Sequence, residues 1–210
     1  MARFEEVSRF HGHVCPGLAM GYRVSEVALV RLAADRAGDE ELVAIVENNS
    51  CAVDAIQAMT GCTFGKGNLI HLDHGKQVYT FMTRPSGRGV RIAVRWTPPP
   101  EAPEVAAAWE AYLGGERTAE VLERVARRKA DKVALILQAR PEELFVVSGP
   151  RIDLPPVARI HQTLPCSRCG ERVMEPRLRP GLDGQVCIPC CTAEDSATET
   201  SRTSPGHAGP

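Results

Sequence analysis

The chain has 210 residues, of which 43% are hydrophobic and 24% charged, and its formal net charge is -1. This composition is typical of a globular protein, and the length suits one medium domain with a small additional module. The near-neutral charge argues against a protein that binds nucleic acid or a membrane surface through general electrostatics. Neither an apolar signal segment nor an apolar run of membrane-spanning length is evident, so we expect a cytoplasmic protein.

The apolar pattern predicts an α+β fold, with a mixed helix and antiparallel-sheet domain at the N-terminus. The first predicted helix covers 16–37, with Pro16 in its first turn and Gly38 as its stop. The elements expected after it are a buried strand over 42–47, a helix over 51–60, a glycine-rich loop over 60–68, strands over 69–83 and 89–96, helices over 104–113 and 117–140, and a last strand over 144–147.

Composition divides the chain into three parts. Residues 1–154 form the predicted α+β metal-binding domain, and Pro155 and Pro156 mark its end. Residues 160–191 hold most of the cysteines and are expected to form a small zinc module. The tail over 192–210 is polar and poor in large apolar residues, so we expect it to be disordered.

The eight cysteines form an early group and a late group. In a reducing compartment, cysteines are more often metal ligands or catalytic groups than disulfides. The late group contains two C-x2-C pairs, separated by residues 170–186, and this spacing is typical of a tetrahedral zinc site with four thiolate ligands. The predicted ligands of this structural Zn²⁺ are Cys166, Cys169, Cys187 and Cys190. Cys191 is a spare, more plausibly a bystander than a substitute for Cys190.

The zinc module carries little that indicates nucleic-acid binding. Between residues 166 and 191 there are four arginines against three acidic residues, and no aromatic residue on which a base would stack. We therefore expect a docking or interface role for this module, with no nucleic-acid or membrane partner.

The early group of cysteines begins beside two histidines. His11, His13 and Cys15 alternate along five residues, so an extended chain would point all three to one side. Cys15 and Cys51 each stand at a predicted helix start, where the helix dipole favours thiolate. Imidazole and thiolate suit zinc, nickel, copper or iron. A shared metal site and a set of ordinary buried cysteines are both compatible with the sequence here.

Three further residues are candidates for supporting roles. Asp54 lies one turn after Cys51 and is expected to orient a ligand or a substrate. Lys66 lies in the glycine-rich loop, which lacks the G-x4-G-K-[ST] phosphate-binding pattern, and either binds an anionic substrate group or is simply solvated. Cys62 is a candidate ligand or redox partner, or a buried apolar residue.

Several segments resemble the FmdE family of formylmethanofuran dehydrogenase subunits. The similar segments are F-H-G-H-x-C-P-G-L-A-x-G-Y-R over 10–23, N-N-x-C-x-x-D-A-I-Q-x-x-T-G-C-T-x-G-K-G-N-L over 48–69, D-x-G-K-x-x-Y-T-F over 73–81 and C-S-R-C-G-E-x-V-M-E over 166–175. The resemblance implies an α+β domain with a C-terminal zinc domain, a cleft that holds a transition metal, and a homodimer. Carried over by position, it implies that His13, Cys15 and Cys51 bind the metal, with His11 close by.

The family name implies a part in one-carbon metabolism beside a molybdenum or tungsten enzyme. The first hypothesis is an accessory subunit or a small metal-dependent enzyme, with zinc, nickel or iron at the N-terminal site and with His11, Asp54 and Lys66 as catalytic residues. His11 is either a fourth ligand or an acid/base group. The second is a non-catalytic metal carrier or regulator that docks a partner through its zinc module. The third is a thiol redox protein that uses Cys51 and Cys62.

Overall fold

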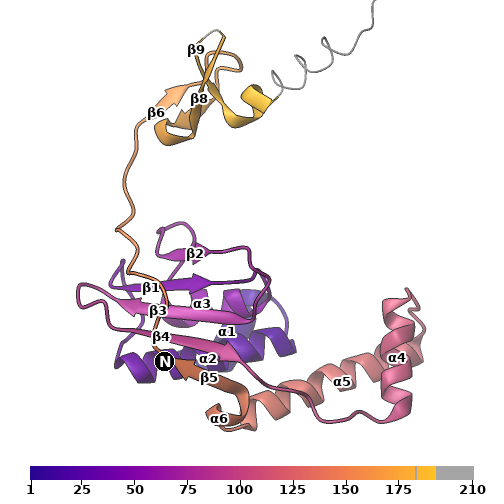
Figure 1. Ribbon diagram of the computed structural model, residues 1–210. Coiled ribbons are helices and arrows are strands. Elements are labelled where there is room, and N and C mark those ends of the chain that lie inside the picture. The colour runs from indigo at the N-terminus through magenta and orange to yellow at the C-terminus, as the bar shows by residue number, and fades with distance from the viewer. Residues whose placement is uncertain (183, 193–210) are drawn as a thin grey trace, which may run out of the picture. The chain divides into compact units, whose positions relative to one another are not determined.

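The computed structural model describes residues 1–182 and 184–192. The chain forms two compact units, Met1–Ala158 and Arg159–Pro210 (Figure 1). Apart from Thr192, the predicted disordered tail lies outside the described residues. Within the described part, no helix combines the length and the apolar character that crossing a membrane requires.

A five-stranded mixed sheet organises the first unit, with its strands in the order β2-β1-β3-β4-β5. β1 pairs parallel with β2, and the other pairs are antiparallel. The strands are β1 (Leu42–Val46), β2 (Leu69–His71), β3 (Val78–Thr83), β4 (Gly89–Val94) and β5 (Phe145–Ser148). β2 and β5 are therefore the two edges of the sheet.

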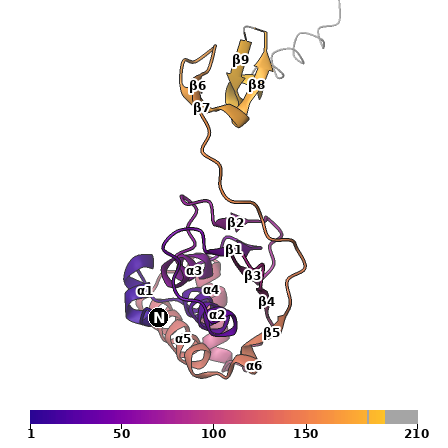
Figure 2. The ribbon, with the colours of Figure 1, turned by 90° about the vertical axis from the view of Figure 1, so that its left-hand side faces the viewer.

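Helices cover one face of this sheet (Figure 2). They are α1 (Phe4–His11), α2 (Pro16–Leu32), α3 (Ala52–Thr60), α4 (Pro103–Leu113), α5 (Ala119–Gln138) and the short α6 (Pro141–Leu144). α2 and α3 lie next to the sheet, and α4 and α5 form a hairpin that extends beyond its end (Figure 1).

The central strand β1 has no polar face, because all five of its residues are buried. Ala44 and Val46 belong to the core beneath the helices. Val43 and Ile45 face the other way and pack with Met82, where Leu154 covers them. A continuous apolar run is what a strand buried on both faces requires. This strand leads directly into the loop that carries Cys51.

The predicted fold class, α+β with a C-terminal four-cysteine module, is confirmed. Two boundaries were wrong. The first helix ends at Leu32 because Ala33 adopts a left-handed conformation with φ 47°, so Gly38 is not its stop. The strand expected over 69–83 is divided into β2 and β3. Helix α1 was not predicted at all, and residues 10–11 belong to it instead of to an extended segment.

The second unit is built from short elements. These are β6 (Thr163–Pro165), β7 (Arg172–Met174), the 3-10 helix η1 (Glu175–Arg177), β8 (Leu178–Gly181) and β9 (Gly184–Cys187). They form two antiparallel pairs, β6 with β7 and β8 with β9. The buried apolar cluster of this unit is centred on Cys166, Val186 and Cys187, so two of its three members are sulfur-containing residues.

Candidate metal centres

The N-terminal site begins where α1 ends. His11 is the last residue of α1, and Gly12 reverses the chain with φ 93°, a left-handed conformation that favours glycine. The chain then reaches Cys15, the N-cap of α2, whose Sγ accepts a hydrogen bond from the Leu18 N–H at 3.4 Å. The predicted helix start at Cys15 and Pro16 is therefore confirmed.

A close crossing of α2 and α3 brings Cys51 to the same place. Cys51 caps α3 directly after the loop from β1. A Cβ on Gly21 would lie 2.2 Å from the Ala52 carbonyl oxygen, and a Cβ on Gly17 would lie 3.2 Å from the Cys51 Cβ. Glycine at both positions lets the starts of the two helices approach, and with them Cys15 and Cys51.

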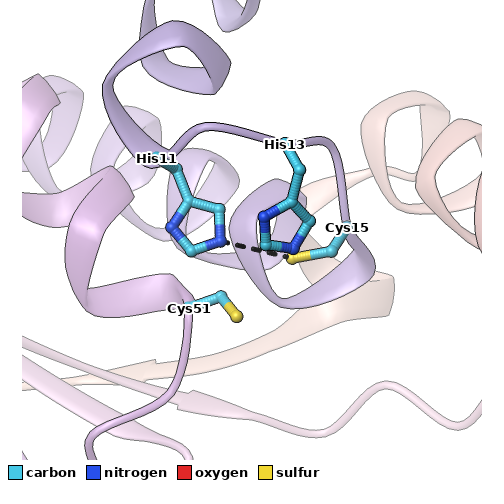
Figure 3. A group of neighbouring side chains, drawn as sticks. All are labelled: His11, His13, Cys15 and Cys51. Carbon is cyan, nitrogen blue, oxygen red and sulfur yellow. Dashed lines mark hydrogen bonds between the residues drawn. The ribbon is translucent and has the colours of Figure 1, made fainter.

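The donor atoms of His11, His13, Cys15 and Cys51 all lie within 4.8 Å of one another. Figure 3 shows the four side chains pointing toward one centre from the end of α1, the loop after it and the start of α3. A tetrahedral ion holds such donors about 3.5 Å apart, so small side-chain rotations are enough to bring all four to one ion. The donor set fits a transition metal such as zinc, nickel or iron.

The orientation of His11 shows which nitrogen faces this centre. Its Nδ1 lies 2.7 Å from Asp54 Oδ2, and its Nε2 lies 3.9 Å from Cys15 Sγ. Metal-binding histidines commonly use their second nitrogen in this way, to contact a carboxylate that fixes the ring. The structure thus brings Asp54 to His11, as the sequence suggested.

The electrostatics of the site favour a cation. Burial raises the pKa of the Cys51 thiol, and the neighbouring Cys15 raises it further. A bound metal ion reverses this effect because it stabilises both thiolates. His13 is the exposed member of the group, and its ring centroid lies 4.4 Å from that of His11.

The C-terminal cysteines form the second centre. The Sγ atoms of Cys166, Cys169, Cys187 and Cys190 also lie within 4.8 Å of one another. Gly170 turns the first pair with φ 76°, and its N–H donates to the Cys166 carbonyl. The backbone N–H groups of Cys169 and Cys187 lower the pKa of Cys166 to about 6. The nearby Cys187 thiol, with burial, raises that of Cys190 to about 12.

Comparisons with known proteins agree with this architecture. The sequence profile of the family described as "FmdE, Molybdenum formylmethanofuran dehydrogenase operon" matches residues 10–146. The chain belongs to the FmdE family. A crystal structure of an FmdE-like protein of tungsten formylmethanofuran dehydrogenase, from Syntrophus aciditrophicus, has the same fold, with a TM-score of 0.56, 22% identity and 90% of each chain covered.

A longer relative is known from Archaeoglobus fulgidus. It is described as a probable S-adenosyl-L-methionine-binding protein and is 33% identical over 193 residues, covering 86% of this chain and 50% of the relative. The FmdE-family chain therefore spans about half the length of this relative, and the ligand in the relative's name carries no conclusion for it.

Two predicted residues of the FmdE-family chain lie away from the N-terminal centre. The Lys66 amine donates to the carbonyls of residues 37–39, at 3.5, 3.2 and 3.0 Å. The Cys62 thiol is fully buried and donates to the Leu42 carbonyl at 3.2 Å. Both residues follow the C-terminal end of α3, whereas Cys51 caps its N-terminus about 13 Å away. A disulfide between Cys51 and Cys62 is therefore excluded.

The residue set expected from the sequence underestimated His11, because α1 was overlooked. Its signal was present, since Phe4 and Val7 are spaced for one helix face and Glu6 follows Arg3 by three residues. Recognising this helix would have placed His11 at a helix end instead of in an extended run.

Proposed function

We propose that this FmdE-family protein is a metal-dependent accessory subunit or small enzyme of one-carbon or redox metabolism. Its working centre is one zinc, nickel or iron ion held by His11, His13, Cys15 and Cys51. The observation that carries the proposal is the convergence of four donors from three separate segments of the chain. The family description supports the metabolic link.

The four donors have different surroundings, which suggests different roles. His11 is held by Asp54 and its side chain is only 10% exposed, and Cys15 is 9% exposed. His13 is exposed on the short loop after Gly12, so it is the ligand most easily replaced by a substrate atom. When bound, the ion supplies Lewis-acid or redox chemistry. The His11–Asp54 pair keeps the His11 Nε2 directed at the centre.

The second centre is proposed to hold a structural zinc. Four thiolates complete a tetrahedral coordination sphere and leave no position for substrate. The low pKa of Cys166 suits a thiolate that is metal-bound at neutral pH.

Metal analysis of protein purified without chelator tests both assignments. We expect two ions per chain in the parent, and one in Cys15→Ser, because a hydroxyl is a poor ligand for these metals. Cys62→Ser is the matched control, since Cys62 lies at the far end of α3 and should leave both ions in place. Retention of two tightly bound ions by Cys15→Ser would contradict the N-terminal centre.

The alternative function is a non-catalytic carrier or regulator that docks through the zinc unit. What supports it is the exposure of large apolar side chains there, with Leu182 88%, Met174 55% and Ile188 41% exposed. A carrier would release the N-terminal ion to a stronger chelator within seconds and show no turnover. An enzyme would keep its ion and lose activity in Cys15→Ser.

We also propose a homodimer, and a molybdenum or tungsten enzyme as a protein partner. The hairpin of α4 and α5 supports the dimer, because Leu113, Leu122 and Leu135 are 67%, 43% and 44% exposed on it. Light scattering should give twice the chain mass, and Leu122→Glu should shift it toward the monomer. A parent protein that is monomeric at micromolar concentration would contradict the dimer.

A further inference from the structure

A groove of about 590 Å³ runs between helix α2 and the edge strand β5. Its lining includes Val30 and Arg31 on α2, Arg95 after β4, and Phe145, Val146 and Val147 on β5. None of these residues belongs to either metal centre, so the groove is a separate feature of the first unit.

The lining shows that the groove follows the free edge of β5. Successive side chains of a strand point to opposite faces of the sheet. Three consecutive residues, 145–147, line this one groove. They do so because the groove runs along the strand backbone on the side that β4 does not occupy, since β5 is the last strand of the sheet.

The backbone along this edge is free to pair. The Arg95 N–H donates to the Leu144 carbonyl at 2.8 Å, and in the antiparallel register Val146 lies opposite Ala93. Alternation then directs the backbone groups of Leu144, Val146 and Ser148 toward β4 and those of Val147 away from it. Within residues 1–182 and 184–192, no hydrogen bond of the Val147 N–H or carbonyl outside the sheet ladder is found.

The side chains beside this edge are cationic and apolar. Arg23, on the floor of the groove, is already bound to Glu26 and to two carbonyls at the end of α5. Arg31 and Arg95 are exposed, and neither has an ion pair among the residues that the structure describes. Val30 and Val146 stand 67% and 51% exposed. The groove therefore offers two unpaired guanidinium groups beside exposed valines.

We propose that this groove binds an extended acidic segment of a partner protein, which adds to β5 as a sixth strand. The partner backbone pairs with Val147, its carboxylates pair with Arg31 and Arg95, and its apolar side chains cover Val30 and Val146. Strand addition of this kind takes affinity from backbone hydrogen bonds and specificity from alternate side chains. A second copy paired edge to edge would bring like arginines together, which disfavours that occupant.

The test is a titration of the full-length, ¹⁵N-labelled protein with synthetic peptides at low salt. The probes are a capped hexapeptide of alternating glutamate and valine, the same peptide with lysine for glutamate, and octanoate. The acidic peptide should shift the Val147 amide resonance and slow its exchange with solvent, and it should bind at least about tenfold more tightly than the basic peptide.

Two sets of variants separate the backbone and charge contributions. Val147→Pro removes the outward N–H without touching the ladder to β4, so the sheet should persist while peptide binding is lost. Arg31→Glu with Arg95→Glu should reverse the preference, so that the lysine peptide binds better. Arg127→Glu, a matched change of an exposed arginine on α5, should leave binding unchanged.

Several results would overturn the proposal. They are equal binding of the two peptides, an unmoved Val147 amide, and octanoate that displaces the acidic peptide fully at an equal concentration. A Val147 amide already protected in a dimer of the parent protein would also overturn it, because a second copy would then occupy the edge. The experiment does not involve the metal, so its failure and that of the N-terminal centre are distinguishable.

Discussion

The two candidate centres bring four donors together by opposite means. In the C-terminal unit, the cysteines are themselves the core, and Val186 is the one fully buried side chain among them. In the N-terminal unit, a large core of strands and helices already exists, and the four donors sit where α1, α2 and α3 meet at its edge.

This difference indicates what each ion contributes. A unit with so little apolar core depends on metal binding for its folding energy. A domain with a complete core can instead hold donors in place before the metal arrives, and such a site is available for function. The comparison predicts that losing the metal unfolds one unit and leaves the other folded.

The largest expected effect is therefore the loss of the zinc unit. Cys169→Ser should remove one zinc per chain and unfold residues 159–192, because structural zinc supplies on the order of 10 kcal/mol to modules of this kind. Amide spectra of the full chain should show the resonances of this unit collapse while those of the first unit stay. Cys191→Ser is the control and should change neither. A Cys169→Ser variant that keeps its zinc and its fold would break the comparison.

A second large effect should come from the glycine at the α2–α3 crossing. In Gly21→Ala the new methyl group would lie 2.2 Å from the Ala52 carbonyl oxygen, so the helices must separate. We expect a loss of stability of about 3 kcal/mol and loss of the N-terminal ion, although every ligand is retained. Gly38→Ala, where the nearest atom would be 3.7 Å away, should do neither. Melting curves and metal content measure both effects.

A third prediction contrasts the buried thiol of the first unit with the thiolates of the second. Burial raises the pKa of Cys62 to about 11 from an ordinary value of 9.0. Stability from the neutral thiol is complete below pH 9 and is lost as the pH rises through 11, because the unfolded chain gives up the proton first. Between pH 8 and pH 10.5 the parent should lose about 2 kcal/mol more than Cys62→Ser. Urea denaturation at the two pH values measures this difference, and equal losses would contradict it.

Much of this contrast could be predicted from the sequence. The C-x2-C spacing alone located the second centre, because both halves of each pair are local in sequence. Cys15 and Cys51 were recognised as helix starts from Pro16 and from the apolar strand before Cys51. Their convergence was not derivable, since it depends on α2 and α3 crossing at Gly21, a contact between distant segments. The place of Lys66 also escaped, because its partners are backbone carbonyls some 28 residues away.

The smallest predicted effect concerns Asp54, and it asks how far the first unit prepares its site. Asp54 touches no metal donor except His11, whose Nδ1 it holds at 2.7 Å, so it is a positioning residue. Its side chain is 41% exposed, which weakens the contact through solvent screening. Asp54→Asn should therefore lower the affinity of the N-terminal centre about tenfold, at the lower end of the effect of such partners.

A positioning role can be told from a structural one. In cobalt-substituted protein, Asp54→Asn should alter the visible spectrum of the N-terminal ion while the melting temperature stays within about 2 °C of the parent. Asp54→Glu, which restores a carboxylate, should recover most of the affinity. Gln57→Ala removes a neighbour of Asp54 on the same helix and should leave the spectrum unchanged. If Asp54→Asn binds cobalt as tightly as the parent and with the same spectrum, His11 is fixed by the fold alone, and the site is prepared even more fully than the comparison requires.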